Sequence, residues 1–226
     1  VPLVLLRLAG VYDDGCHSPP LAHQMQRIYE RQLAARLYSG ETSHGQAYVH
    51  LADVVDAIER TIERRDRLPP EVAVLIAEAE TLSYDELQHT FQRLLLGASE
   101  ETVTVPGPFA KLGAWLQNRL PGGDAFVRPW MIDRANDHYA VDIGRARRLL
   151  EWNPRHALRT TLPVMVGALE ADPAAWYREH GLEPGRALRR RFAAAAAHAA
   201  TPARRHRCPH HADVVRDAAG ECPRCT

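Results

Sequence analysis

The chain has 226 residues, of which 46% are hydrophobic, and its 28 Lys and Arg residues are balanced by 28 Asp and Glu residues. A net charge of zero produces no global field that would attract nucleic acid or an anionic membrane, so neither is expected as a partner. The apolar content is enough for a sizeable core and excludes wholesale disorder. The apolar opening segment is interrupted by Arg7 and is too short for a signal peptide or a membrane span.

Strand and helix patterns alternate along the first four fifths of the chain. Short apolar runs predict buried strands, and apolar residues at steps of three and four predict helices. The predicted strands cover residues 3–8, 47–51 and 72–76, and the predicted helices cover residues 21–37, 53–62, 83–96, 142–150 and 158–169. The Pro- and Gly-rich residues 98–138 are expected to be irregular. Because the chain opens directly on a core strand, we expect it to be a fragment or a truncated gene product.

Capping residues mark where the predicted helices begin and end. Asp53 is predicted to cap the second helix. The inward stripe of that helix is predicted to be Val54, Ile58 and Ile62. The segment from Ser83 to Glu86 is a capping box, and Gly97 is the expected stop signal of the helix that follows. Strands that alternate with capped helices indicate an α/β fold with a partly parallel sheet.

Four segments, in order along the chain, carry residues of one family pattern. They are Leu-Arg-Leu-Ala-Gly-Val-Tyr at 6–12, Tyr-Val-His-Leu-Ala-Asp-Val-Val-Asp-Ala-Ile at 48–58, the helix start at 80–87, and the closing segment at 142–154. Together they resemble the NAD-dependent epimerase/dehydratase family of extended short-chain dehydrogenases/reductases. The resemblance implies that residues 1–182 are the carboxyl-terminal part of such a protein. They would form an incomplete Rossmann-like sheet remnant plus a substrate-binding subdomain.

The family's cofactor turn and catalytic pair are both missing from the sequence. The 14 glycines contain no Gly-x-Gly-x-x-Gly or Gly-x-x-Gly-x-x-Gly turn, which would hold a pyrophosphate at a helix amino terminus. The family's Tyr-x-x-x-Lys cannot be built either, because Lys111 is the only lysine and Gly107 stands where the tyrosine would be. No catalytic or cofactor-binding residue is therefore predicted. NAD(P) is assigned to the intact parent protein, and this chain alone is expected to be inactive.

Part of a substrate pocket is predicted to remain. By resemblance, Tyr12 and the following His17 and Ser18 would line the cleft beside the nicotinamide. His50 and Asp53 lie at the carboxyl end of a predicted strand, where α/β folds place their ligands. Structural alternatives stay open for three of these residues: packing for Tyr12, a hydrogen-bonded strand position for His50, and helix capping for Asp53. The expected partner is a small molecule with a sugar-like or other hydroxyl or carbonyl group, and a homodimer stays open.

The composition changes after residue 182. Residues 183–206 are rich in Arg and Ala, hold almost no apolar face, and are predicted to be a partly helical linker. The last residues, 207–226, hold two ligand pairs separated by ten residues. The predicted metal ligands are Cys208, His211, Cys222 and Cys225.

The two pairs at the end of the chain fit one metal ion. Two thiolate or imidazole pairs, each with two residues between its members, complete a tetrahedral shell around zinc or a softer ion. With the proline after Cys208 and after Cys222, they resemble the small heavy-metal-binding module that is appended to metal-transport proteins. His210 stands where that module usually has methionine, which favours zinc over copper. We therefore expect a small metal-stabilised carboxyl-terminal module.

Three of the four cysteines lie in this tail, and Cys16 stands alone as an expected bystander. A metal site in a reducing, intracellular compartment, the cytoplasm, is therefore expected rather than a disulfide framework. Two functions follow from the sequence. The first is the substrate-domain portion of an NAD(P)-dependent epimerase, dehydratase or reductase. The second is a non-catalytic protein that binds or senses zinc or copper on an α/β scaffold.

Overall fold

The computed structural model describes residues 3–105 and 141–200, together with His206–Arg207 and Val215–Arg216. The chain divides into two compact units, Val1–Glu183 and Pro184–Thr226. No helix within these described ranges is long and apolar enough to cross a bilayer.

The sheet of the first unit is built from parallel strand pairs. Strand β1 (Leu3–Leu8) pairs in parallel with β5 (Glu71–Ile76). The chain continues from β1 into β2 (Gly10–Tyr12), which pairs in parallel with β4 (Tyr48–His50). The continuous segment therefore changes its partner at Ala9. Parallel pairing of this kind confirms the predicted α/β fold class.

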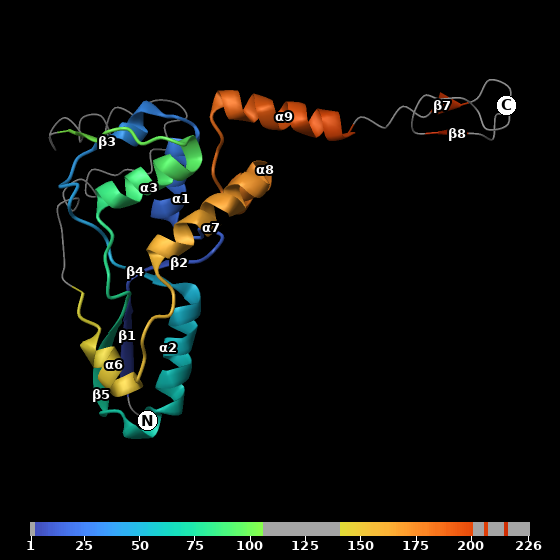
Figure 1. Cartoon of the computed structure of the whole chain (residues 1–226). Helices are drawn as coiled ribbons and strands as arrows, with labels where there is room; N and C mark the ends of the chain where they lie inside the picture. The colour runs from blue at the N-terminus through green and yellow to red at the C-terminus, as the bar shows by residue number, and fades with distance from the viewer. Residues whose placement is uncertain (1–2, 106–140, 201–205, 208–214, 217–226) are drawn as a thin grey trace, which may run out of the picture. The chain divides into compact units, whose positions relative to one another are not determined.

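Two helices cover one face of the β1–β5 pair. Helix α2 (Leu51–Glu63) and helix α6 (Gly144–Leu150) contact each other and share one apolar core with β5 (Figure 1). Trp152, which follows α6, is fully buried in this core, and its indole N–H donates to the carbonyl of Asp53 at 3.0 Å. On the opposite face of β1, the side chains of Leu3 and Leu5 are 63% and 53% exposed.

A second group of helices lies beyond the carboxyl ends of the strands (Figure 1). Helix α3 (Tyr84–Leu96) packs against both α1 (Pro19–Tyr29) and α7 (Leu158–Ala171), and α8 (Pro173–Glu179) packs against α7. The remaining short elements of this unit are η1 (Leu33–Arg36), β3 (Leu37–Tyr38), η2 (Arg65–Arg67) and β6 (Val103–Thr104), with β3 and β6 parallel.

The second unit contains helix α9 (Arg186–Ala200) and an antiparallel pair of short strands, β7 (His206–Arg207) and β8 (Val215–Arg216). Helix α9 falls within the segment predicted to be a partly helical linker. The four predicted metal ligands, at 208, 211, 222 and 225, lie outside the described residues.

Two predicted helix boundaries are wrong. The helix predicted over 21–37 ends at Tyr29, because Arg31 adopts a left-handed conformation with φ of 54° and the chain continues as η1. Asp53 does not cap α2. The cap is His50, whose ring nitrogen accepts the N–H of Ala52, and Asp53 lies inside the first turn.

The predicted inward stripe of α2 is also wrong in part. Val54 is buried as predicted, but Ile58 and Ile62 are 43% and 58% exposed, and Ala57 takes the second buried position. The predicted capping box at the start of α3 is confirmed, since the Ser83 hydroxyl and the Glu86 carboxylate each accept the other's backbone N–H. Gly97 ends that helix in a left-handed conformation with φ of 72°, as predicted.

Candidate functional site

A cavity of about 470 Å³ opens where the sheet changes partner. Residues 13–15, which follow β2, form one wall, and His50 with the first turn of α2 forms the other. Because β2 and β4 are parallel neighbours, their carboxyl ends meet at this edge. Ligands of α/β proteins bind at such an edge. The wall combines the carboxylates of Asp13 and Asp14 with one imidazole, a set of groups that suits hydroxyl-bearing molecules.

The His50 ring lines this cavity, with its Nε2 atom buried. Its Nδ1 accepts the N–H of Ala52 at 3.1 Å, so the proton of the neutral ring lies on Nε2. Nε2 is 3.4 Å from the Asp14 carboxylate and makes no hydrogen bond among the described residues. The ring is held in place by stacking on His156, with 4.1 Å between the centroids. His50 is therefore fixed in position with its polar Nε2 left unsatisfied.

Asp53 fixes the segment that carries His156. The Asp53 carboxylate is 2% exposed and accepts the backbone N–H groups of Arg155 and His156 at 3.1 and 3.0 Å. The His156 ring nitrogen Nδ1 is also within 3.1 Å of it. In this arrangement Asp53 anchors the loop before α7, and the aromatic neighbour of His50 depends on it.

Tyr12 lies behind this wall, 1% exposed, in a buried polar pair. Its hydroxyl donates to Glu78 Oε1 at 2.6 Å, and the N–H of Leu158 donates to Glu78 Oε2 at 2.9 Å. Burial raises the pKa of the Tyr12 hydroxyl, and the hydrogen bond and negative charge of Glu78 raise it further. Burial likewise raises the pKa of Glu78. Since both partners of the carboxyl group are donors, its ionised form satisfies both bonds.

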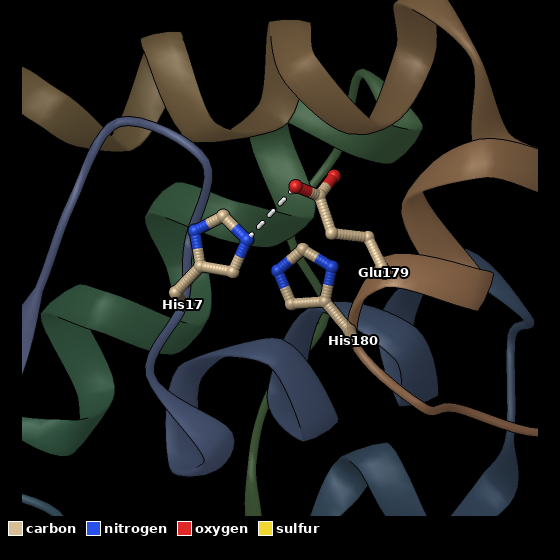
Figure 2. A group of neighbouring side chains, drawn as sticks. All are labelled: His17, Glu179 and His180. Atoms are coloured by element: carbon tan, nitrogen blue, oxygen red, sulfur yellow. Dashed lines mark ion pairs between the residues drawn. The ribbon is translucent and has the colours of Figure 1, made fainter.

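A second cavity, of about 200 Å³, lies on the other side of the 13–18 loop. His17 and Ser18 line it together with Glu179 and His180 from the end of α8. Figure 2 shows His17 opposite these two side chains, with an ion pair of 3.3 Å between His17 Nε2 and Glu179. The loop is tied to α8 by a further hydrogen bond, from the Trp176 indole N–H to the carbonyl of Gly15 at 3.1 Å.

Asp13 organises the loop between the two cavities. Its Oδ1 accepts the N–H of His17 at 2.9 Å, and its Oδ2 lies 2.8 Å from the Nδ1 of the same residue. Partial burial opposes the ionised form of Asp13, but these bonds outweigh it and lower the pKa of the carboxyl. Partial burial likewise opposes the charged His17 ring, while Asp13 and Glu179 together raise the pKa of that ring. Cys16 is fully buried beneath the loop, and burial raises the pKa of its thiol to about 12, which makes it unreactive.

The predicted pocket residues therefore fall into two groups. Tyr12, His50 and Asp53 gather at the end of the sheet, and the rings of Tyr12 and His50 meet edge to face at 5.1 Å. His17 and Ser18 line the second cavity instead. Contact with a substrate stays a prediction for all five.

Sequence reasoning missed four residues of these sites: Glu78, His156, Glu179 and His180. Glu78 could have been found from the sequence, because it is a carboxylate two residues after a buried strand, where ligand sites of α/β folds lie. His156 follows the closing Trp-x-Pro segment. Glu179 and His180 lie at the end of a seven-residue helix that has no strong apolar period, so no pattern draws attention to them.

Comparisons with known proteins identify the fold. No family model matches the sequence, and no curated protein matches it either. A UDP-glucose 4-epimerase from Thermotoga maritima, solved with UDP-glucose, superimposes on 74% of this chain with 18% identity and a TM-score of 0.51. An epimerase from Methanothermobacter thermautotrophicus superimposes on 79% with 16% identity and a TM-score of 0.54. A dTDP-glucose 4,6-dehydratase from Bacillus anthracis, solved with NAD, superimposes on 78% with 14% identity and a TM-score of 0.53.

These structural neighbours are two epimerases and a dehydratase, and this chain has part of their α/β fold. The match covers 46%, 46% and 47% of the three neighbouring chains. The chain thus spans slightly less than half the length of the solved structures that it matches.

Proposed function

We propose that this chain forms the substrate side of an NAD(P)-dependent epimerase, dehydratase or reductase that acts at a hydroxyl or carbonyl carbon of a sugar-like molecule. The observation that carries the proposal is that β1 has one strand edge without a partner among the described residues and one face with exposed leucines. Among the described residues β1 pairs only with β5, and its outward Leu3 and Leu5 remain largely exposed. Parallel sheets are normally covered on both faces. The other half of a Rossmann-like domain would pair along the free edge of β1.

The residues present in this chain do not fit a dinucleotide. The sequence has no glycine-rich turn to approach a pyrophosphate, and its single lysine cannot complete Tyr-x-x-x-Lys. We therefore assign no catalytic step to this chain. Its own contribution is to bind and orient the substrate, with the Nε2–H of His50 as a donor and the carboxylates of Asp13 and Asp14 as acceptors at the first cavity.

A titration followed by backbone amide NMR tests this proposal. UDP-glucose, added to the full chain, is expected to shift the amide signals of Asp14, His50 and Ala52, whereas NAD shifts none of them. His50→Ala is expected to weaken the affinity for the sugar nucleotide about fivefold, because each lost bond to a neutral donor costs about 1 kcal/mol. His89→Ala is the matched control, since His89 lies on α3, away from the first cavity, and pairs with Asp85. Shifts with NAD alone, or no response to a panel of nucleotide sugars, would contradict the proposal.

A second function is favoured by one observation in the second unit. Strand β7 ends at Arg207, directly before Cys208, and it pairs antiparallel with β8. We propose that Cys208 and His211 bind a zinc ion together with Cys222 and Cys225, the pair near the end of the chain. Metal handling would then be a function that is independent of the sheet.

Native mass spectrometry of the full chain with Zn²⁺ and Cu(I) tests the second function. We expect one additional metal ion in the wild type compared with the Cys222→Ser/Cys225→Ser variant, because a tetrahedral site loses half its ligands in that variant. Equal metal content in the two proteins would reject the tail as a metal site.

A further inference from the structure

The second cavity contains three metal-ligating side chains on two separate elements. His17 belongs to the loop before α1, and Glu179 and His180 belong to the end of α8 (Figure 2). One ligand atom from each lies within 4.8 Å of the other two. His17 Nε2 and Glu179 Oε1 are already 3.3 Å apart. That is about the separation of two ligands bound to one zinc ion at 2.0–2.1 Å.

Both histidines are oriented by their other ring nitrogen. The Nδ1 of His17 lies 2.8 Å from the Asp13 carboxylate, and the Nδ1 of His180 lies 2.7 Å from the carbonyl of Trp176. Each Nδ1 is therefore a donor, and each neutral ring has its lone pair on Nε2. Histidines that bind metals show this arrangement, in which a carboxylate or backbone carbonyl holds the nitrogen that does not bind.

One buried nitrogen of this cluster, the Nε2 of His180, has no hydrogen-bond partner among the described residues. A buried nitrogen without a partner destabilises the fold, because it has lost its hydrogen bond to water and gained none in return. The ion pair between His17 and Glu179 accounts for their approach, but it does not satisfy this nitrogen. A cation between the three side chains would.

We propose that His17, Glu179 and His180 form a binding site for a divalent transition-metal ion, zinc in the first instance, with a fourth position open to the second cavity. Two imidazoles and one carboxylate are ligands that zinc accepts in proteins. The site is separate from the thiolate pairs near the end of the chain, and it does not depend on the substrate-side function. Because its ligands come from two elements, the ion would fasten α8 to the 13–18 loop.

Uptake of the ion requires one ring to move. The rings of His17 and His180 are stacked at 4.7 Å with only 7° between their planes, so their lone pairs lie in two parallel planes and do not meet at one point. His180 is held between its bond to Trp176 and the stacked indole at 3.9 Å. The His17 side chain is 44% exposed and has room to tilt toward the ion. The His17 ring is therefore the one that we expect to turn on binding.

The test uses the full chain with the tail thiolates removed, Cys208→Ser/Cys222→Ser/Cys225→Ser, so that zinc held by these thiolates does not mask the histidine site. Isothermal titration with Zn²⁺ is expected to give one site per chain, and saturating zinc is expected to raise the melting temperature. Glu179→Ala and His180→Ala, each added to this background, are expected to weaken binding at least tenfold. Asp13→Asn is expected to weaken it about 10- to 100-fold through its effect on His17.

Two controls keep the outcome decisive. His23→Ala removes a histidine that lines the same cavity but lies outside the cluster, and it is expected to retain full affinity. The Glu179 side chain is 62% exposed, so Glu179→Ala is expected to fold normally even if His180→Ala does not. No zinc bound by the thiolate-free chain would overturn the proposal. Unchanged affinity in Glu179→Ala and His180→Ala would overturn it as well.

Discussion

At the scale of single residues, the first cavity rests on buried polar groups that satisfy one another. Glu78 links the end of β2, through Tyr12, to the start of α7, through the N–H of Leu158. Asp53 links α2 to the loop before α7 in the same way. Buried groups of this kind are costly when one partner is lost, because the other is left unsatisfied.

Tyr12→Phe is therefore expected to destabilise the fold by about 1–3 kcal/mol, since Glu78 Oε1 loses its donor in a buried position. Urea denaturation measures the difference. Tyr48→Phe is the matched control, because its hydroxyl bonds at 3.3 Å to the exposed Gln46, which can turn to water. Equal losses of unfolding free energy in the two variants would mean that the Tyr12–Glu78 hydrogen bond stabilises the fold no more than the Tyr48–Gln46 bond does.

The protonation of His17 gives a pH dependence with a defined sign. Asp13 and Glu179 raise the pKa of His17 in the folded chain above its usual value near 6.5. Its stabilising contribution is therefore complete below about pH 6.5 and is lost as the pH rises through the raised folded pKa. With a chelator present, the difference in melting temperature between wild type and His17→Ala should shrink as the pH rises from about 6.5 through the raised folded pKa. A difference that grows over this range would contradict the assignment.

The positions of some of these residues could be predicted from the sequence, and those of others could not. Tyr12 and His50 are the last residues of β2 and β4, and Asp53 follows β4 closely, so their grouping at one edge could be predicted. The role of Asp53 could not, because an acidic residue near a helix start looks like a cap. The true cap, His50, is an uncommon residue at that position. His180 meets His17 only through the packing of α8, which no local pattern encodes.

At the scale of elements, the local signals at the two ends of α3 were predicted correctly, whereas the cap predicted for α2 was not. The capping box of α3 closes with a hydrogen bond of 3.2 Å from the Glu86 N–H to the Ser83 hydroxyl, and a return bond of 3.0 Å from the Ser83 N–H. Its prediction needed no knowledge of tertiary structure, because both partners lie in one turn. The bond from the Ser83 N–H to the Glu86 carboxylate lowers the pKa of Glu86, as expected for a group that stabilises a helix start.

Ser83→Ala is expected to cost about 1 kcal/mol, because the first turn of α3 loses its side-chain acceptor. The midpoint of urea denaturation reports the change. Ser43→Ala provides the comparison, since Ser43 bonds only to the exposed carboxylate of Glu41, and its loss is expected to stay within about 0.5 kcal/mol. A Ser83 variant as stable as the Ser43 variant would show that the box contributes nothing.

Helix α2 shows where periodicity fails. Apolar residues occupy two adjoining stripes of this helix, so steps of three and four fit either face. The buried stripe contains Val54 and Ala57, whereas the second stripe is 43–58% exposed. The exposed stripe consists of Leu51, Val55, Ile58 and Ile62. Only the contact of α2 with the sheet and α6 decides between the two faces, and that contact is tertiary.

At the scale of the whole molecule, the first unit is a parallel sheet fragment with one covered face and an exposed set of leucines on the other. The solved structures that it matches are about twice as long. The missing glycine-rich turn and the single lysine led us to expect a partial domain, and this stays a prediction. Under the substrate-side proposal, the other half of the domain would pair along β1, which pairs only with β5 among the described residues.

Amide hydrogen exchange along β1 tests this account most directly. The N–H groups of Leu3 and Ala9 bond to Pro70 and to Ile76, at the two ends of β5, so odd-numbered amides face β5. The period of two along a strand then turns the amides of Val4, Leu6 and Leu8 toward the free edge.

In the full chain, we expect the amides of Val4, Leu6 and Leu8 to exchange rapidly and those of Leu5 and Arg7 to exchange slowly. That alternation would show that one edge of β1 is unpaired in this chain, as the substrate-side proposal requires. Equal and strong protection of all five amides, independent of protein concentration, would mean that the edge is already paired within this chain, and the proposal would fail.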